Sequence, residues 1–172
     1  MWGFVAHTLL PIGNMGVGQP AAEEPVLSVL RDNLPSEGVY MVPGLAPEKM
    51  SDEAAVKAYS ERAKANPYAF IVYQPQGVDG MEMTDNLIKQ LVSDTLAAFI
   101  AAFVLALGAF GFAKRVLVSV LLGLFAWLTI SFPYWNWYRF PMEFTVANLL
   151  EQVLGWLFAG MAIAWWLGRR GR

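Results

Sequence analysis

Cysteine is absent from the 172-residue chain, and histidine occurs only once, as His7. Without cysteine there is no disulfide framework, no thiol nucleophile and no cysteine-based metal site, and a lone histidine does not make a zinc site. The sequence also lacks the glycine-rich phosphate-binding loops, the nucleophile-elbow pattern and the His-Glu-x-x-His motif of zinc proteases. We therefore expect no catalytic residues and predict that the protein is not an enzyme.

Charge is scarce as well, and unevenly placed. Charged residues make up 15% of the chain and hydrophobic residues 56%, with a mean hydropathy of +0.42. All acidic residues except Glu143 and Glu151 precede residue 95, so a polar, acidic first half is followed by a nearly uncharged second half. This distribution is typical of a membrane protein and argues against the basic surface that nucleic-acid binding needs.

Three apolar runs are long enough to cross a bilayer: residues 95–113, 116–132 and 146–168. At about 1.5 Å per residue the first extends about 28 Å, close to a hydrocarbon core of about 30 Å. A core helix of a soluble protein seldom stays apolar on every face for this length. The sequence therefore predicts a membrane α-helical fold with three complete spans in residues 95–172.

Basic residues beside the spans predict their orientation. Lys114 and Arg115 are expected in a tight turn between the first two spans, and Arg169, Arg170 and Arg172 follow the third. Basic residues near span ends are enriched on the cytoplasmic side, so both clusters belong in the cytoplasm. We therefore expect a cytoplasmic C-terminus and place residues 13–94 outside the cytoplasm.

The loop on the opposite side is expected over residues 133–145. It contains Arg139 as its only basic residue and a cluster of aromatic rings that includes Trp135 and Trp137. Aromatic rings with a polar edge favour the headgroup level of a bilayer, so we expect an interfacial belt that packs beside the second span. A platform for a ligand or pigment is the alternative.

The first apolar segment, within residues 1–12, is only about eleven residues long and too short to span a bilayer. We expect either an interfacial segment or a half-span, the outer part of a helix whose first turns are missing. His7 lies in this segment, and Pro11 indicates a helix end at which the histidine meets water. The alternative is a histidine that binds haem iron, chlorophyll magnesium or copper.

Residues 13–94 have the patterning of a small soluble α+β domain. A helix is expected to begin at the acidic residues before Pro25 and to end at Pro35. Ser51 is expected to cap a second helix, which ends at residues 66–67. Short strands are predicted for residues 38–43 and 68–73.

A further helix is expected to begin with Thr84 or Asp85 as its cap and to continue without a break into the first span. Its first half carries apolar residues at helical spacing, which we expect to face the soluble domain. These residues are Leu87, Ile88, Leu91 and Val92.

Glu151 and Gln152 are polar residues within the third span. We expect them to pack against a neighbouring helix or to form a local ion pair, because Arg139 and Glu143 are near in sequence. The alternative is a carboxylate that transfers protons or ions. A transporter would normally have broken helices or repeats around its site, and neither is evident.

Met81 and Met83 form a Met-x-Met pattern before the first span. Two thioethers are soft ligands, so a copper(I) site is one interpretation. Filling gaps in a small core is the ordinary role of methionine and the interpretation that we favour. No cofactor is therefore predicted.

Two groups of short motifs carry a resemblance to a known family. The first is Trp2-Gly3, His7, Leu10-Pro11 and Gly13; the second is Asn33-Leu34-Pro35, Gly38-Val39-Tyr40 and Pro43-Gly44. In these motifs and in its layout the chain resembles a group of uncharacterised bacterial inner-membrane proteins. Their layout is an amino-terminal helix, a small extracytoplasmic domain and three C-terminal helices. The resemblance implies an inner-membrane location, a periplasmic soluble domain and a missing first half-helix, and it implies no catalytic residues.

We expect a non-enzymatic accessory or structural subunit of a larger membrane complex, in contact with lipid and with larger membrane-protein partners. Small residues in the first span allow the close approach of another helix. They include Ala97, Ala98, Ala101 and Ala102. The alternatives are a small transporter or channel-like protein that uses Glu151, and a metal or pigment binder that uses His7 or Met81 and Met83.

Overall fold

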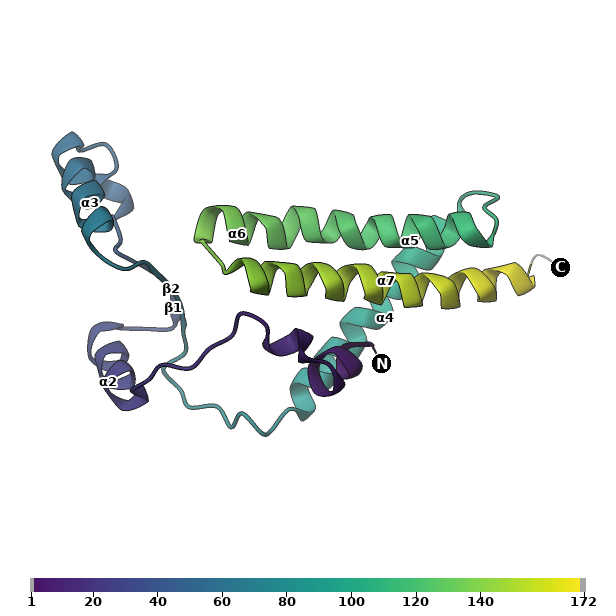
Figure 1. The fold of residues 1–172 in the computed structure, drawn as a ribbon, viewed down its shortest axis with the longest axis horizontal. Helices are drawn as coiled ribbons and strands as arrows, with labels where there is room; N and C mark the ends of the chain where they lie inside the picture. The colour runs from purple at the N-terminus through teal and green to yellow at the C-terminus, as the bar shows by residue number, and fades with distance from the viewer. Residues whose placement is uncertain (1, 171–172) are drawn as a thin grey trace. The chain divides into compact units, whose positions relative to one another are not determined.

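The computed structural model describes residues 2–170 and is built mainly from helices (Figure 1). It divides into two compact units, Met1–Gly18 with Met81–Arg172, and Gln19–Gly80. The divisions fall at residues 18 and 80 rather than at the expected 12 and 94. The amino-terminal segment belongs with the membrane helices as far as Gly18, and the helix of the first span begins at Thr84.

Three helices among the described residues are long and apolar enough to cross a membrane. The first is α4 (Thr84–Ala106), and the third is α7 (Met142–Arg170). The second combines α5 (Phe112–Ala126), a π-helical turn η4 (Trp127–Ser131) and α6 (Phe132–Tyr138). The prediction of a multi-pass α-helical membrane protein is confirmed.

The turn between the first two spans lies at residues 107–111, and the prediction that Lys114 and Arg115 form it is wrong. Both residues lie in the first turn of α5. The Phe110 ring lies over Gly108 in this turn, 2.6 Å from where a Cβ would be. Long basic side chains do not need to end a helix, because their stems can extend from its end towards the headgroups.

The prediction of a loop over residues 133–145 is also wrong, because most of this stretch is helical. Only residues 139–141 separate α6 from α7. Pro133 has no N–H to donate, and the hydrogen-bond ladder shifts just before it, where the Phe132 N–H bonds the Trp127 carbonyl. Arg139 then turns the chain with a left-handed backbone at φ 57°.

α5 and α7 pack against each other in antiparallel directions through small residues (Figure 1). A Cβ on Gly123 would lie 2.7 Å from the Gln152 carbonyl oxygen, and a Cβ on Gly160 would overlap the buried Ser119 side chain. Helices in lipid associate through such close backbone approach, since no hydrophobic driving force acts between them. The start of α5 and the end of α7 therefore lie at the same end of this hairpin.

The small residues of α4 serve packing within the chain. Ala101 and Leu105 are 1% and 0% exposed. The large side chains of Phe99, Ile100 and Phe103 are each at least 66% exposed. Close helix approach through Ala101 thus occurs with the chain's own helices, and bulky apolar side chains cover the face that is left to lipid or to a partner.

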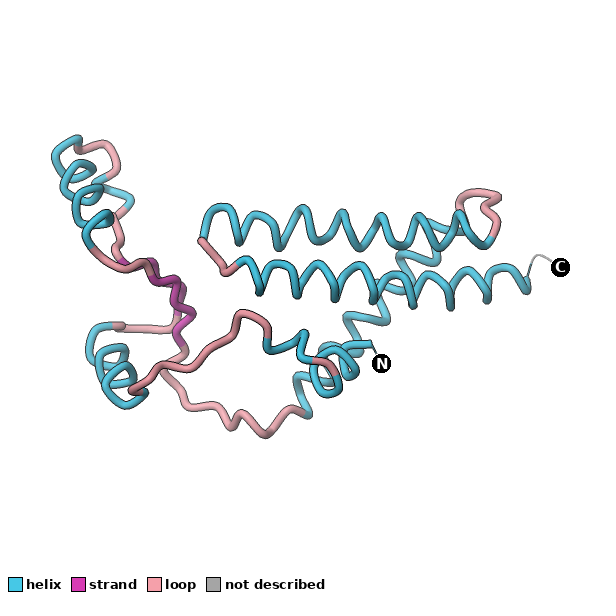
Figure 2. Tube along the Cα trace, in the orientation of Figure 1, coloured by secondary structure: helices cyan, strands magenta, loops and turns pink. Residues whose placement is uncertain are grey.

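The unit Gln19–Gly80 contains α2 (Glu23–Asn33), β1 (Gly38–Val42), a 3-10 turn η3 (Pro47–Lys49), α3 (Glu53–Ala65) and β2 (Ala69–Tyr73). The two strands form an antiparallel sheet (Figure 2), in which Val39 lies opposite Val72 and Met41 opposite Phe70. An α+β character was predicted and is confirmed. The pairing of the strands was not predicted.

At the starts of α3 and α4, carboxylate side chains accept hydrogen bonds from backbone N–H groups. Asp52, not Ser51, caps α3, and its side chain accepts bonds from the N–H groups of Ala54 at 2.9 Å and Ala55 at 3.2 Å. At the start of α4 neither Thr84 nor Asp85 is the cap. The Glu82 carboxylate accepts the Thr84 N–H at 3.2 Å. Its hydrogen bonds with the Thr84 side chain and backbone lower the pKa of Glu82.

Four apolar side chains in the first half of α4 are at least 55% exposed: Leu87, Ile88, Leu91 and Val92. They belong to the unit of the membrane helices. That they face the unit Gln19–Gly80 stays a prediction.

Candidate functional site

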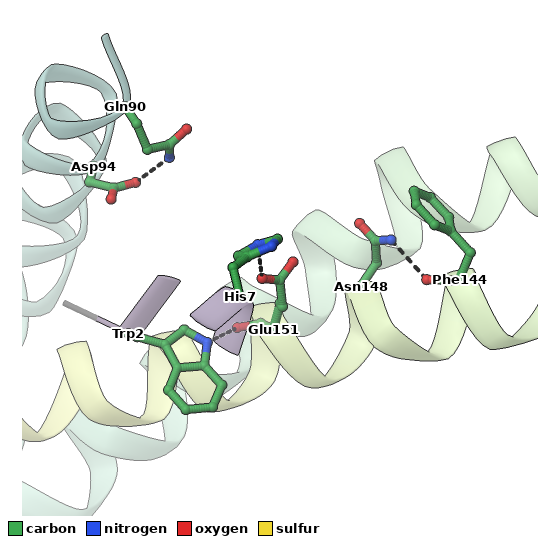
Figure 3. Close-up of polar contacts among 7 residues, drawn as sticks. All are labelled: Trp2, His7, Gln90, Asp94, Phe144, Asn148 and Glu151. Atoms are coloured by element: carbon green, nitrogen blue, oxygen red, sulfur yellow. Dashed lines mark hydrogen bonds and ion pairs between the residues drawn. The ribbon is translucent and has the colours of Figure 1, made fainter. Parts of the chain in front are cut away.

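The amino-terminal segment packs on α7 and brings two side chains to one residue of that helix. The segment consists of α1 (Trp2–Phe4), a π-helical turn η1 (Val5–Leu9) and a 3-10 turn η2 (Pro11–Asn14). The Trp2 indole N–H donates to the Glu151 backbone carbonyl oxygen at 3.1 Å (Figure 3). The Trp2 ring packs 5.3 Å from the Phe158 ring.

His7 and Glu151 form an ion-pair contact between the amino-terminal segment and α7. His7 Nε2 lies 2.6 Å from Glu151 Oε1, with the side chains 56% and 25% exposed (Figure 3). The contact is an ion pair when the imidazole is protonated and a hydrogen bond from Nε2–H when it is neutral. Glu151 thus has a partner from the other end of the chain.

Glycines allow the segment to lie close to α7 along its length. A Cβ on Gly155 would lie 3.0 Å from the Trp2 ring, and a Cβ on Gly13 would overlap His7 Nδ1. Gly16 has φ +73°, and a Cβ there would lie 2.6 Å from the Phe144 backbone nitrogen. Ala6 is fully buried within the same segment. The segment is therefore a fitted part of the membrane unit.

The contact with Glu151 engages one of the two ring nitrogens of His7. A metal ligand must offer a ring nitrogen. Nε2 contacts the Glu151 carboxylate, and Nδ1 lies where a Cβ on Gly13 would be. A metal ion on Nε2 would have to displace the carboxylate.

Other polar groups around the pair bond within their own helices. The Asn148 side-chain amide donates to the Phe144 carbonyl, and that of Gln90 donates to Asp94, each at 2.8 Å (Figure 3). The backbone carbonyl oxygen of Gln152 faces Gly123 of α5. The Glu151 side chain thus contacts the amino-terminal segment, whereas the backbone of Gln152 lies against α5.

Aromatic rings gather where α6 turns into α7. The Trp135 ring packs 5.2 Å from Phe132, while Trp137 is 74% exposed. A cavity of about 260 Å³ lies nearby and is lined by Ile130, Ser131, Tyr134, Phe140, Phe144, Thr145 and Asn148. Neither Trp135 nor Trp137 lines it, so these two residues do not form a ligand platform with this cavity.

Metal ligands do not converge anywhere in the part of the chain that the structure describes. No group of three or more His, Asp or Glu side chains there could hold a metal ion. Met81 and Met83 precede α4 and are 84% and 52% exposed. They fill no core gap, so the favoured interpretation of these methionines is wrong.

A broad depression of about 610 Å³ lies beside the end of β1 in the unit Gln19–Gly80. Arg62 lines it, and Arg62 Nη2 donates to the Gly44 carbonyl at 2.6 Å.

The contact between His7 and Glu151 was missed in the sequence, although each residue was singled out. They are the isolated ionisable residues of two apolar segments, and such residues seldom stay unpaired at membrane depth. The need of each residue for a polar partner was the sequence feature that could have predicted their contact.

Comparison with protein-family models, curated proteins and solved structures finds no match. Fold and site define a multi-pass helical membrane protein with a small α+β unit.

Proposed function

We propose that the protein is a non-enzymatic accessory subunit of a larger complex in the bacterial inner membrane. Its three spans lie in lipid and pack against larger membrane-protein partners. The unit Gln19–Gly80 lies in the periplasm and docks on an exposed surface of the partner.

One observation carries this proposal: the soluble unit has almost no core of its own. Among residues 19–80 only Pro43 is buried. A unit of roughly 60 residues is marginal even with a full hydrophobic core. A two-stranded sheet likewise needs more strands or a covering element for stability. The missing burial is best supplied by another protein.

Apolar side chains for such an interface are present on α2. Val26, Leu27 and Val29 are 43%, 41% and 61% exposed, and Val26 and Val29 are neighbours on the helix surface. Full burial of one valine or leucine side chain contributes about 1.5–3 kcal/mol. A partner that covers α2 would therefore gain affinity and stabilise the unit at the same time.

The basic residues support the proposed orientation. Lys114 at the start of α5 and Arg169 at the end of α7 lie at the same end of the hairpin and contact the rings of Phe110 and Trp165. Basic residues at one end of a membrane hairpin favour the cytoplasmic side for that end. α5 begins at this cytoplasmic end, and α4 crosses the membrane once before it. The start of α4, and the unit Gln19–Gly80 that precedes it, therefore lie on the periplasmic side.

The test is purification of tagged protein from its native membrane in mild detergent, with quantification of whatever co-purifies. We expect one larger membrane protein in a fixed ratio. Val29→Asp should remove it, because a charge then enters the apolar face of α2. Val78→Asp is the matched control, since Val78 is a 75% exposed valine outside α2 and the strands. Wild-type protein without a partner, or retention of the partner by both variants, would refute the role.

A small proton transporter is the second candidate, favoured by the contact between Glu151 and His7. Two ionisable groups at membrane depth are a functional-site candidate. Neither residue lines either of the two cavities described above, and α7 is unbroken across Glu151. We therefore favour the accessory role, and proton flux separates the two candidates.

A further inference from the structure

The outer edge of β2 is a strand edge that pairs with no other strand. In the part of the chain that the structure describes the sheet has two strands, so β2 has β1 on one side and no strand on the other. Its five residues, Ala69–Tyr73, include no charge and no proline, and its immediate neighbours are Tyr68 and Gln74. Natural proteins protect such edges with charged residues, proline, bulges or covering elements.

The edge of β1 is protected in a way that the edge of β2 is not. Glu37 directly precedes β1, and Pro43 directly follows it. A charge and a proline at the two ends of a short strand discourage addition of another strand. The ladder between β1 and β2 runs through five consecutive pairs without a bulge, so the edge of β2 is also regular.

We propose that β2 pairs with β2 of a second copy of this chain, in antiparallel orientation, to form a four-stranded sheet across a two-fold axis. Three or more strands give a sheet the stability that two lack. The inference does not depend on the accessory role, because it concerns the edge of the sheet and not the face of α2.

Charge around β2 favours a second copy in this orientation. The first charged residue before the strand is Lys64, and the first after it is Asp79. In antiparallel pairing the basic end of one β2 lies beside the acidic end of the other, whereas parallel pairing would place like charges together. Lys64 is 69% exposed and contacts Glu61 on its own helix, a surface pair of little strength.

The charge of the whole unit opposes self-association only weakly. Residues 19–80 contain nine acidic and five basic side chains. Exposed charges more than about 8 Å apart are largely screened at physiological ionic strength. The uncharged strand edge decides the contact, because its backbone groups meet within hydrogen-bonding distance.

The proposed sheet makes a geometric prediction that a cysteine scan tests. The two β2 strands would be neighbours about 4.8 Å apart, while the two β1 strands would be about 14 Å apart, three strand spacings. A disulfide needs Cα atoms within about 7 Å. The natural chain has no cysteine, so every introduced cysteine is the only one.

The full chain is reconstituted in lipid, with one cysteine at each position of β2 in turn, and oxidised mildly. We expect a disulfide-linked dimer at the position nearest the two-fold axis and a steep fall on either side. Val39→Cys on β1 should give none, although Val39 is 61% exposed. Equal cross-linking at Val39 and along β2 would indicate random collision and overturn the proposal, as would the absence of cross-links.

A second variant pair guards against a cysteine that disturbs the fold. Val72 in β2 and Val29 in α2 are 75% and 61% exposed. Val72→Lys places a charge on the strand in each copy, and we expect the dimer fraction at fixed concentration to fall by about tenfold. Val29→Lys, which lies outside the sheet, should leave it unchanged. A wild-type protein that is monomeric by mass at every concentration tested would overturn the proposal.

Discussion

His7 Nε2 and Glu151 Oε1 meet at 2.6 Å, and they join the amino-terminal segment to the third span. The backbone oxygen of the same Glu151 accepts the Trp2 indole N–H. One residue of α7 therefore anchors two side chains among the first seven residues of the chain. Each ionisable group supplies the partner that the other needs in an apolar environment.

Glu151→Gln tests whether this contact is structural. Glutamine keeps an oxygen that accepts the His7 N–H, so the segment should stay in place. We expect a loss of about 1 kcal/mol, the usual difference between a charge-assisted and a neutral hydrogen bond. Thermal unfolding in detergent measures it. Glu151→Leu, which removes the acceptor, should cost more and should release the segment to protease.

The same variant separates packing from proton transfer, because glutamine cannot titrate. Proton flux into sealed proteoliposomes should be no greater for the wild-type protein than for Glu151→Gln. A folded variant that has lost a measurable wild-type flux would refute the structural role and support the transporter.

Gly155→Leu should displace the amino-terminal segment without unfolding the helices. A Cβ at Gly155 would already lie 3.0 Å from the Trp2 ring, and a leucine occupies the place of that ring. Overpacking of this kind costs about 1–3 kcal/mol. We expect faster proteolysis of residues 2–14. Gly168→Leu on the same helix is the matched control, because nothing lies within 4 Å of a Cβ there.

Glu82 should make the start of α4 sensitive to acid. Its pKa is lowered in the folded chain by hydrogen bonds with the Thr84 side chain and backbone. A group with a lowered folded-state pKa stabilises the fold above its unfolded pKa, and the effect is lost as pH falls through the folded pKa. Protection of the Thr84 amide from hydrogen exchange should therefore fall in acid. Glu82→Gln should remove this dependence, and an unchanged profile in that variant would contradict it.

Protease accessibility tests the proposed orientation. Trypsin added to sealed right-side-out vesicles should cut within residues 19–80 and spare a tag that follows Arg172, because the basic residues favour a cytoplasmic C-terminus. Loss of the tag before the soluble unit would invert the topology.

The spans could be predicted from sequence because their hydropathy does not depend on any partner. Their ends could not, since Lys114 and Arg115 lie in the first turn of α5 and not in the turn before it. The turn at Arg139 could not be predicted either. Pro133 suggests a helix end, but the π-helical turn before it lets the helix continue to Tyr138.

The contact between His7 and Glu151 could be found only in the three-dimensional structure. It depends on how the amino-terminal segment lies on α7, which Gly13, Gly16 and Gly155 allow and which no local pattern encodes.

Hydrogen exchange of α2 tests the proposed accessory role most directly. It compares the purified protein with the same protein in its native membrane. Val26, Leu27 and Val29 are exposed on α2, and the soluble unit has almost no core. Amides of Glu23–Asn33 should therefore exchange rapidly in the purified protein and become protected in the native membrane. Equal protection of α2 in both states would contradict the role, because the unit would then be stable without a partner.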